Sequence, residues 1–215
     1  MPVRRPSVVL ATGNLHKLRE ISAMLANEPF ELLGLMGFPD IVLPAETGTT
    51  FEENAVEKSV AAARGTGLVS LGDDSGLEVD ALAGAPGVRS ARYGGEHATD
   101  RDNLELLLEN LAEVPDGRRS ARFVCVIAVA HPDGRVKVVR GACEGEIIRQ
   151  RRGSHGFGYD PIFLIPADGR TLAQFSPDEK NAISHRALAV QQAAPIIRFL
   201  LAGSRDPGFD GQVGP

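Results

Sequence analysis

SVVLATGNLHK, residues 7–17, places a short apolar run directly before a helical pattern. The run Ser7–Ala11 contains β-branched residues and predicts a strand. Over residues 15–25 the apolar side chains return at helical spacing, so the turn from strand to helix falls on residues 12–14. Backbone N–H groups at a helix start can bind an anion, and Lys17 lies within reach of a bound phosphate. The spacing of a Walker loop is absent, so an ordinary strand-to-helix turn with a surface lysine stays open.

Composition and charge limit the classes of protein to consider. The chain has 215 residues, of which 43% are hydrophobic and 24% charged, as is usual for a soluble globular protein with one large domain or two small lobes. The net charge of −5 opposes long nucleic-acid partners. No apolar run approaches the length of a membrane span, and the run after the N-terminal arginines is too short for a signal peptide. We therefore expect a cytoplasmic protein with neither a nucleic-acid nor a membrane partner.

Strand and helix patterns alternate in the N-terminal half. Strands are expected over residues 30–35, 68–72 and 77–81, and helices over 51–64 and 99–111. Thr50 and Glu53 form a capping box at the start of the first of these helices.

The second half begins with a predicted hairpin, residues 121–130 and 136–148 around the turn at 131–134. Two helices follow, one starting at Ser176 and one over 184–201. The expected fold class is α/β: a single mixed-sheet domain over residues 1–202 with two lobes and a central substrate cleft. Residues 203–215 are polar and glycine-rich and predict a flexible tail.

The two cysteines lie on the two arms of the hairpin, nearly equidistant from its turn. Cys125 and Cys143 could form a cross-strand disulfide, but two buried, reduced thiols are the expected state in a cytosolic protein.

Adjacent carboxylates follow the strand predicted over 68–72. Asp73 and Asp74 would be costly at the exit of a buried strand without a cation or hydrogen-bond donors. Mg²⁺ favours one or two carboxylates together with phosphate oxygens and water. Glu46 lies in a loop without a capping role and is the better second metal ligand, while Lys58 is a candidate second phosphate contact. The alternatives are a solvated turn for the aspartates and a solvated helix face for Lys58.

A second glycine-rich loop covers residues 153–161. Its glycines allow the backbone to approach a ligand, and Phe157 suits stacking on a planar base. The alternative is a turn whose aromatic side chains anchor the loop in the core.

Three cationic side chains lie at or near the last two helix starts. Lys180, His185 and Arg186 are disfavoured there by the helix dipole, so their presence needs a reason. Their donors would suit the oxygen at position 6 of a purine and would find no partner in the amino group of adenine. A surface histidine and an ion-paired arginine are the alternative.

Together these segments resemble the inosine triphosphate pyrophosphatase family, the non-canonical purine nucleoside triphosphate pyrophosphatases. The matching pieces occur in the family's order: T-G-N-x-x-K at 12–17, E-T-G-x-T-F-x-E-N at 46–54, D-D-S-G-L at 73–77, P-G-V-x-S-A-R-Y-x-G at 86–95, F-G-Y-D-P at 157–161 and S-H-R at 184–186.

The resemblance implies an elongated two-lobed fold, a homodimer, dependence on Mg²⁺, and hydrolysis of ITP, dITP and XTP to the monophosphate and pyrophosphate. It implies that Asp74 is the proton acceptor and a metal ligand. Relatives often place a metal-binding acidic residue where this chain has Ala45, so Glu46 or additional water would complete the metal site. The residues implied to contact substrate are Thr12, Gly13, Asn14, Leu15, His16, Lys17, Ser75, Phe157, Gly158, Tyr159, Asp160, Lys180, His185 and Arg186.

Two other classes of function remain to be separated from this one. A nucleotide sensor without turnover has little need for the water-activating carboxylate that the pair at 73–74 offers. A pyrophosphatase of modified pyrimidines is less well served by the pair at 185–186, which favours a 6-oxopurine.

Overall fold

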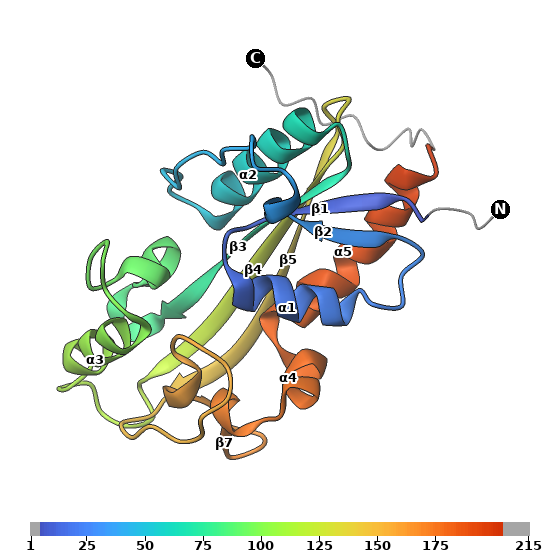
Figure 1. The fold of residues 1–215 in the computed structure, drawn as a ribbon. Helices are drawn as coiled ribbons and strands as arrows, with labels where there is room; N and C mark the ends of the chain where they lie inside the picture. Colours follow the sequence, from blue (N-terminus) through green and yellow to red (C-terminus); the bar gives the residue numbers. More distant parts are fainter. Residues whose placement is uncertain (1–4, 204–215) are drawn as a thin grey trace. The chain divides into compact units, whose positions relative to one another are not determined.

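A computed structural model describes residues 5–203 and has a mixed α/β architecture (Figure 1). Seven strands form one sheet in the order β2-β1-β3-β4-β5-β6-β7. Strand β1 is parallel to β2 and to β3, whereas β6 is antiparallel to β5 and to β7. The predicted α/β mixed-sheet class is confirmed. The strands are β1 Ser7–Ala11, β2 Glu31–Gly34, β3 Ser70–Val79, β4 Ser120–Ala130, β5 Val136–Ile147, β6 Phe163–Ile165 and β7 Arg170–Thr171. The α-helices are α1 Leu15–Met24, α2 Phe51–Thr66, α3 Asp100–Asn110, α4 Pro177–Ile183 and α5 His185–Leu201.

Local sequence signals fix most helix starts. The Thr50 side chain accepts a hydrogen bond from the Glu53 N–H, and the Glu53 carboxylate caps the backbone of Thr50 in return, which confirms the predicted capping box. Helix α2 ends at Gly67, whose φ of 68° suits a residue without a side chain. Ser176 caps α4 in the same reciprocal way.

The strand prediction around Asp73 is wrong in one respect. Instead of two short strands separated by a turn, β3 runs without a break from Ser70 to Val79. Its register with parallel strand β1 ends at the pair Ala11 and Gly72. Asp73 and Asp74 therefore lie inside β3, directly after its last partner on β1, and β4 is the neighbour of β3 on its other side.

The described residues divide into two compact units, which we call unit 1 and unit 2. Unit 1 contains residues 5–74, 125–141 and 186–203. Alternate side chains of β1 enter different cores: Val8 and Leu10 pack with residues of α1 and α5, whereas Val9 packs with Ala62 of α2. Helices thus cover both faces of this part of the sheet, as Figure 1 shows.

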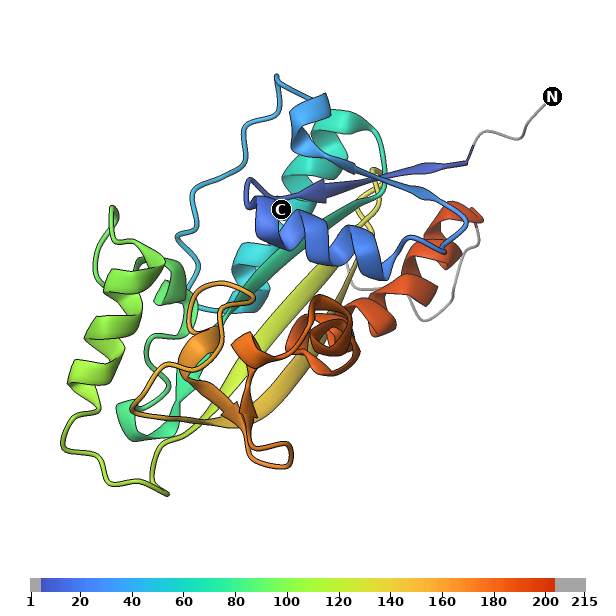
Figure 2. The same ribbon diagram turned by 60° about the horizontal axis from the view of Figure 1, so that its bottom comes forward.

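Unit 2 contains residues 75–124 and 142–185 and has its own core. Helix α3 contributes Leu104 and Leu107, which pack with Leu77 of β3 and Phe163 of β6. Figure 2 shows the short strands β6 and β7 continuing from β5 within this unit. The two lobes and the central cleft stay predictions.

Both cysteines are buried free thiols, so their predicted burial is confirmed, and their reduced state in solution stays a prediction. Within residues 5–203, no helix is both long enough and apolar enough to cross a membrane. The predicted tail, residues 203–215, lies outside the described residues except for Gly203.

Candidate active site

The turn between β1 and α1 is built by Thr12 and Asn14. The Thr12 hydroxyl accepts a hydrogen bond from the Asn14 N–H at 3.1 Å. The Asn14 side chain then caps α1 by accepting from the N–H groups of His16 at 2.9 Å and Lys17 at 3.2 Å. Fewer backbone donors are therefore available for an anion than the sequence predicted.

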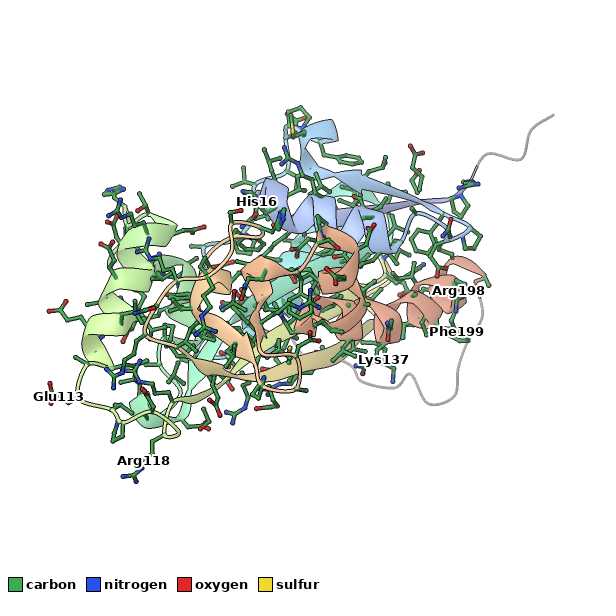
Figure 3. The ribbon with its side chains drawn as sticks, turned by 90° about the horizontal axis from the view of Figure 1, so that it is seen from below. His16, Glu113, Arg118, Lys137, Arg198 and Phe199 are labelled. Atoms are coloured by element: carbon green, nitrogen blue, oxygen red, sulfur yellow. The ribbon has the colours of Figure 1, made fainter. Side chains whose placement is uncertain are left out.

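The N–H groups of Gly13 and Leu15 are the donors of this turn that remain for a ligand, since within residues 5–203 neither is hydrogen-bonded. His16, labelled in Figure 3, is exposed at the start of α1. These positions keep the turn as the predicted phosphate site, with a smaller set of donors.

Asp73 is fully committed to internal partners in unit 1. Its Oδ1 lies 2.5 Å from Lys17 Nζ, and its Oδ2 lies 3.4 Å from Arg186 Nε. The Cys125 thiol donates to the same Oδ2 at 3.0 Å. Burial alone would raise the pKa of Asp73, but the charges of Lys17 and Arg186 outweigh it and hold the pKa well below its usual range. The ionised form of Asp73 is therefore favoured, and its charge holds Lys17, Arg186 and the Cys125 thiol in place.

Asp74 is held differently. Asn54 donates to its Oδ2 at 2.9 Å, and Lys58 Nζ lies 3.3 Å from its Oδ1. Burial raises the pKa of Asp74, and the opposing effects of Lys58, Lys17 and the Asn54 hydrogen bond do not cancel that rise. Two adjacent carboxylates therefore have pKa values shifted in opposite directions, a pattern that separates a structural carboxylate from one suited to accept a proton.

Lys58 links the acidic residues of this cluster. Its ammonium group donates to Glu46 Oε1 at 2.7 Å, to the Asp73 carbonyl at 2.7 Å and to Asp74 Oδ1 at 3.3 Å. Burial lowers its pKa, but Asp74 and Glu46 raise it by more, so Lys58 stays charged. All three donors of the Lys58 ammonium group are occupied, two of them by the carboxylates of Glu46 and Asp74. Contact with a phosphate would require one of these bonds to be exchanged.

Asn54 and Gly72 are two site residues to which sequence reasoning gave no role. The Asn54 amide joins two segments, accepting from the Gly48 N–H at 2.9 Å while donating to Asp74. Gly72 lets α2 lie against β3, because a side chain there would collide with the carbonyl of Ala55. Their positions in the sequence could have indicated both roles, because Asn54 ends the 46–54 motif and Gly72 directly precedes the aspartate pair.

The donor set can be tested for a metal ion. Among the described residues, no group of three or more His, Cys, Asp or Glu side chains gathers as a metal site. Asp74 and Glu46 nevertheless converge on one ammonium group, and Glu46 is close enough to raise the pKa of Asp74. Two hard oxygen donors of this kind suit Mg²⁺ when phosphate oxygens and water complete its shell. The residues present fit such an ion.

A second cluster lies in unit 2. Asp160 Oδ2 accepts from Lys180 Nζ at 2.7 Å and from the Phe157 N–H at 2.9 Å. Lys180 Nζ also lies 5.0 Å from the centre of the Phe157 ring, within cation–π range. Gly156 is required beside them, since its φ is 76° and a side chain would collide with the Asp160 carboxylate. The structure thus brings three predicted base-site residues together.

The neighbours of this cluster have mainly anchoring contacts. The Gly158 N–H donates to Asp100 at 2.8 Å, and the buried Tyr159 donates from its hydroxyl to the Ser90 carbonyl at 2.9 Å. Tyr159 therefore anchors the loop, as the alternative interpretation of this segment had it, while Phe157 stays half-buried. His185 is buried and stacks on Phe123 with ring centres 4.9 Å apart.

The remaining predicted site residues are Arg186 and Ser75. Arg186 belongs to unit 1, where it is buried against Asp73 and Glu20, with Nη1 2.5 Å from Glu20 Oε2. Ser75 is half-buried on β3, at the start of unit 2.

Comparison with known proteins connects this geometry to a family. Residues 8–196 match the model of the Ham1 family. The dITP/XTP pyrophosphatase of Geobacillus kaustophilus is 50% identical over 183 residues, covering 85% of this chain and 90% of the relative. The dITP/XTP pyrophosphatase of Desulforamulus reducens is 46% identical over 193 residues, covering 90% and 96%. The solved structure of a HAM1 protein from Coxiella burnetii superimposes with a TM-score of 0.82 at 44% identity, covering 90% of this chain and 98% of that one. With the family model matched over most of its length, the chain belongs to the Ham1 family.

Proposed function

We propose that this protein hydrolyses the non-canonical purine nucleoside triphosphates dITP, XTP and ITP to the monophosphate and pyrophosphate, and so cleanses the nucleotide pool. The observation that carries the proposal is the division of labour between Asp73 and Asp74, one fixed as an anion and the other with a raised pKa. A binding module has no need of the second carboxylate. The names of the relatives support the substrate class.

The reaction assigns a task to each group of unit 1. Asp74 accepts a proton from the water whose oxygen attacks the α-phosphorus, and the bond between that phosphorus and the bridging oxygen to the β-phosphate breaks. Pyrophosphate leaves with the bridging oxygen. Lys17 and the N–H groups of Gly13 and Leu15 bind the phosphate oxygens, and Lys58 holds Asp74 in position. Mg²⁺ held by Asp74 and Glu46 would supply neutralisation of the phosphate charge.

We assign recognition of the base to unit 2. The face of Phe157 can stack on a planar base, and the fixed donors of Lys180 suit a 6-oxo group. The amino group of adenine offers no acceptor there, so the wrong base would leave a buried donor unpaired. On the family resemblance we further propose that the protein acts as a homodimer in the cytoplasm and depends on Mg²⁺.

Product analysis tests the proposal. The purified protein is incubated with dITP, XTP, dATP and dUTP in the presence of Mg²⁺, and the products are separated by ion-exchange chromatography. We expect monophosphate and pyrophosphate from dITP and XTP, no orthophosphate, and loss of turnover with a chelator. Orthophosphate formed without an added inorganic pyrophosphatase, or preferred cleavage of dUTP, would overturn it.

A further inference from the structure

Unit 2 contains a cavity of about 300 Å³ that is lined by three arginines. None of its lining residues belongs to the two clusters described above. It lies beside the loop that follows α3. Its walls come from Asp116, Gly117 and Arg119 of this loop and from residues 146–150 and Arg152, which follow in and after β5. Figure 3 labels Glu113 and Arg118, two residues of the same loop whose side chains project outward.

Arg119 is the innermost cation of this cavity, with only 2% of its surface exposed. Its Nε donates to the Val114 carbonyl at 3.0 Å, and its Nη2 donates to the carbonyl of Leu111 at the end of α3. These bonds clamp the loop to the helix. They leave Nη1 buried without a hydrogen-bond partner among the described residues. A buried guanidinium donor left unpaired is costly, so the clamp alone does not explain this arginine.

The charge of Arg119 is also poorly compensated. Asp116 Oδ1 lies 3.9 Å from Arg119 Nε but 2.9 Å from Arg149 Nε, and its side chain is 79% exposed. Arg149 is itself anchored on the same loop, through the carbonyls of Ala112 at 3.1 Å and Val114 at 3.0 Å. Two guanidinium groups therefore share one exposed carboxylate.

The third arginine adds a charge at the rim. Arg152 is exposed, and within residues 5–203 no hydrogen bond or ion pair involves its side chain. Glu146 is the other carboxylate of the lining. Three arginines against two carboxylates leave a net positive charge, on a chain whose total charge is −5. A water molecule could satisfy Nη1 of Arg119, but it could not neutralise this charge.

We propose that the cavity is a second anion site of the protein, which binds a small phosphate-type oxyanion such as orthophosphate or pyrophosphate. A tetrahedral oxyanion offers several acceptors to planar guanidinium forks, and arginine pairs bind such groups more specifically than single ammonium groups do. The volume of about 300 Å³ accommodates a ligand of this size. The proposal does not depend on the hydrolytic function, because the cavity shares no residue with the proposed active site.

Calorimetric titration with sodium phosphate and with sodium pyrophosphate, against sodium chloride at matched ionic strength, tests it. Arg152→Gln and the double variant Arg149→Gln/Arg152→Gln each remove charge from the lining, while Arg118→Gln removes one exposed charge from the same loop without touching the cavity. We expect a saturable heat in wild type and in Arg118→Gln. Loss of one charge-assisted bond should weaken binding about 10-fold or more in Arg152→Gln, and further in the double variant. Thermal melting checks that each variant is folded.

The active-site cluster also carries lysines, so a local readout is needed. In ¹H–¹⁵N spectra of the arginine side chains, the Nε–Hε signals of Arg119 and Arg149, assigned with Arg119→Lys and Arg149→Gln, should shift and saturate along the same curve as the heat. Three outcomes would each overturn the site. The heat saturates while these signals do not move, all variants bind with equal affinity, or chloride gives the same response as phosphate. Binding of pyrophosphate but not orthophosphate would assign the ligand as the larger anion.

Discussion

Arg186 and Asp73 form an ion pair inside unit 1, with Nε 3.4 Å from Oδ2 and both side chains almost fully withdrawn from solvent. The arginine comes from the first turn of α5 and the aspartate from β3, 113 residues apart along the chain. Glu20 on α1 holds the other end of the guanidinium. This pair therefore ties a helix start to the strand that carries the proposed catalytic carboxylate.

Replacement of Arg186 by alanine should be strongly destabilising. It removes one of the two cations that neutralise the buried Asp73, and breaking a buried pair in this way costs about 3–5 kcal/mol. Arg198→Ala is the matched control, because Arg198 lies on the same helix as Arg186 but its ion pair with Glu28 is half-exposed. Loss of that pair should cost about 0–1 kcal/mol. Urea unfolding at neutral pH measures both. Equal losses would mean that Arg186 is not part of the structural support.

The same pair predicts a pH dependence of stability. The folded pKa of Asp73 is lowered, so its stabilisation is present above its unfolded value of about 3.9 and is lost as the pH falls below that value toward the folded pKa. The difference in unfolding free energy between wild type and Arg186→Ala should therefore shrink at acid pH. A difference that stays constant from pH 7 to pH 3 would argue against this assignment.

Asp74→Asn should remove catalysis while leaving the fold in place. The amide cannot accept a proton, and loss of a general base typically costs about 10²–10⁴-fold in rate. Asp73→Asn is the neighbouring control: it should lose more unfolding free energy than Asp74→Asn, since its carboxylate is the one neutralised by Lys17 and Arg186. Turnover of dITP and urea unfolding are measured on both. Near wild-type kcat in Asp74→Asn would move the base elsewhere, with Asp73 the first suspect.

Local sequence signals predicted elements better than they predicted contacts. The capping residues Thr50 and Ser176 encode their helix starts within four residues, so the sequence alone places them. The unbroken course of β3 through Asp73 depends on pairing with a distant strand, which no local pattern contains. The motifs likewise named Lys58, Asp74 and Arg186, but the pairing of Arg186 with Asp73 is decided by how α5 packs, which no local pattern contains. The contact of Arg186 with a base stays a prediction.

The acid limb of the pH–rate profile should follow the charges around Asp74. Asp74 must be ionised to accept a proton, so kcat/KM falls as the pH drops through its raised pKa. Lys58→Met removes the main group that lowers this pKa and should move the limb to higher pH. Glu46→Gln removes a carboxylate that raises it and should move the limb to lower pH. The quantity compared is the pH at the midpoint of the acid limb, and the maximal kcat/KM of each variant does not enter the comparison. Shifts in the same direction would mean that another group controls it.

Lys180→Met should damage base selection more than chemistry. Lys180 Nζ lies 2.7 Å from Asp160 Oδ2 and 5.0 Å from the centre of the Phe157 ring, in the cluster to which we assign recognition of the base. If its ammonium donates to a 6-oxo group, its loss should lower kcat/KM for dITP by about 10–150-fold, equivalent to about 1.5–3 kcal/mol for a charged hydrogen bond. Activity on dATP should change much less, because no such bond forms there, and the ratio of the two should fall toward unity. Phe157→Leu is the companion variant: loss of stacking should lower both activities together and leave the ratio unchanged. Equal proportional losses on dITP and dATP in Lys180→Met would instead give Lys180 the structural task of holding Asp160, and discrimination would then have to rest on His185.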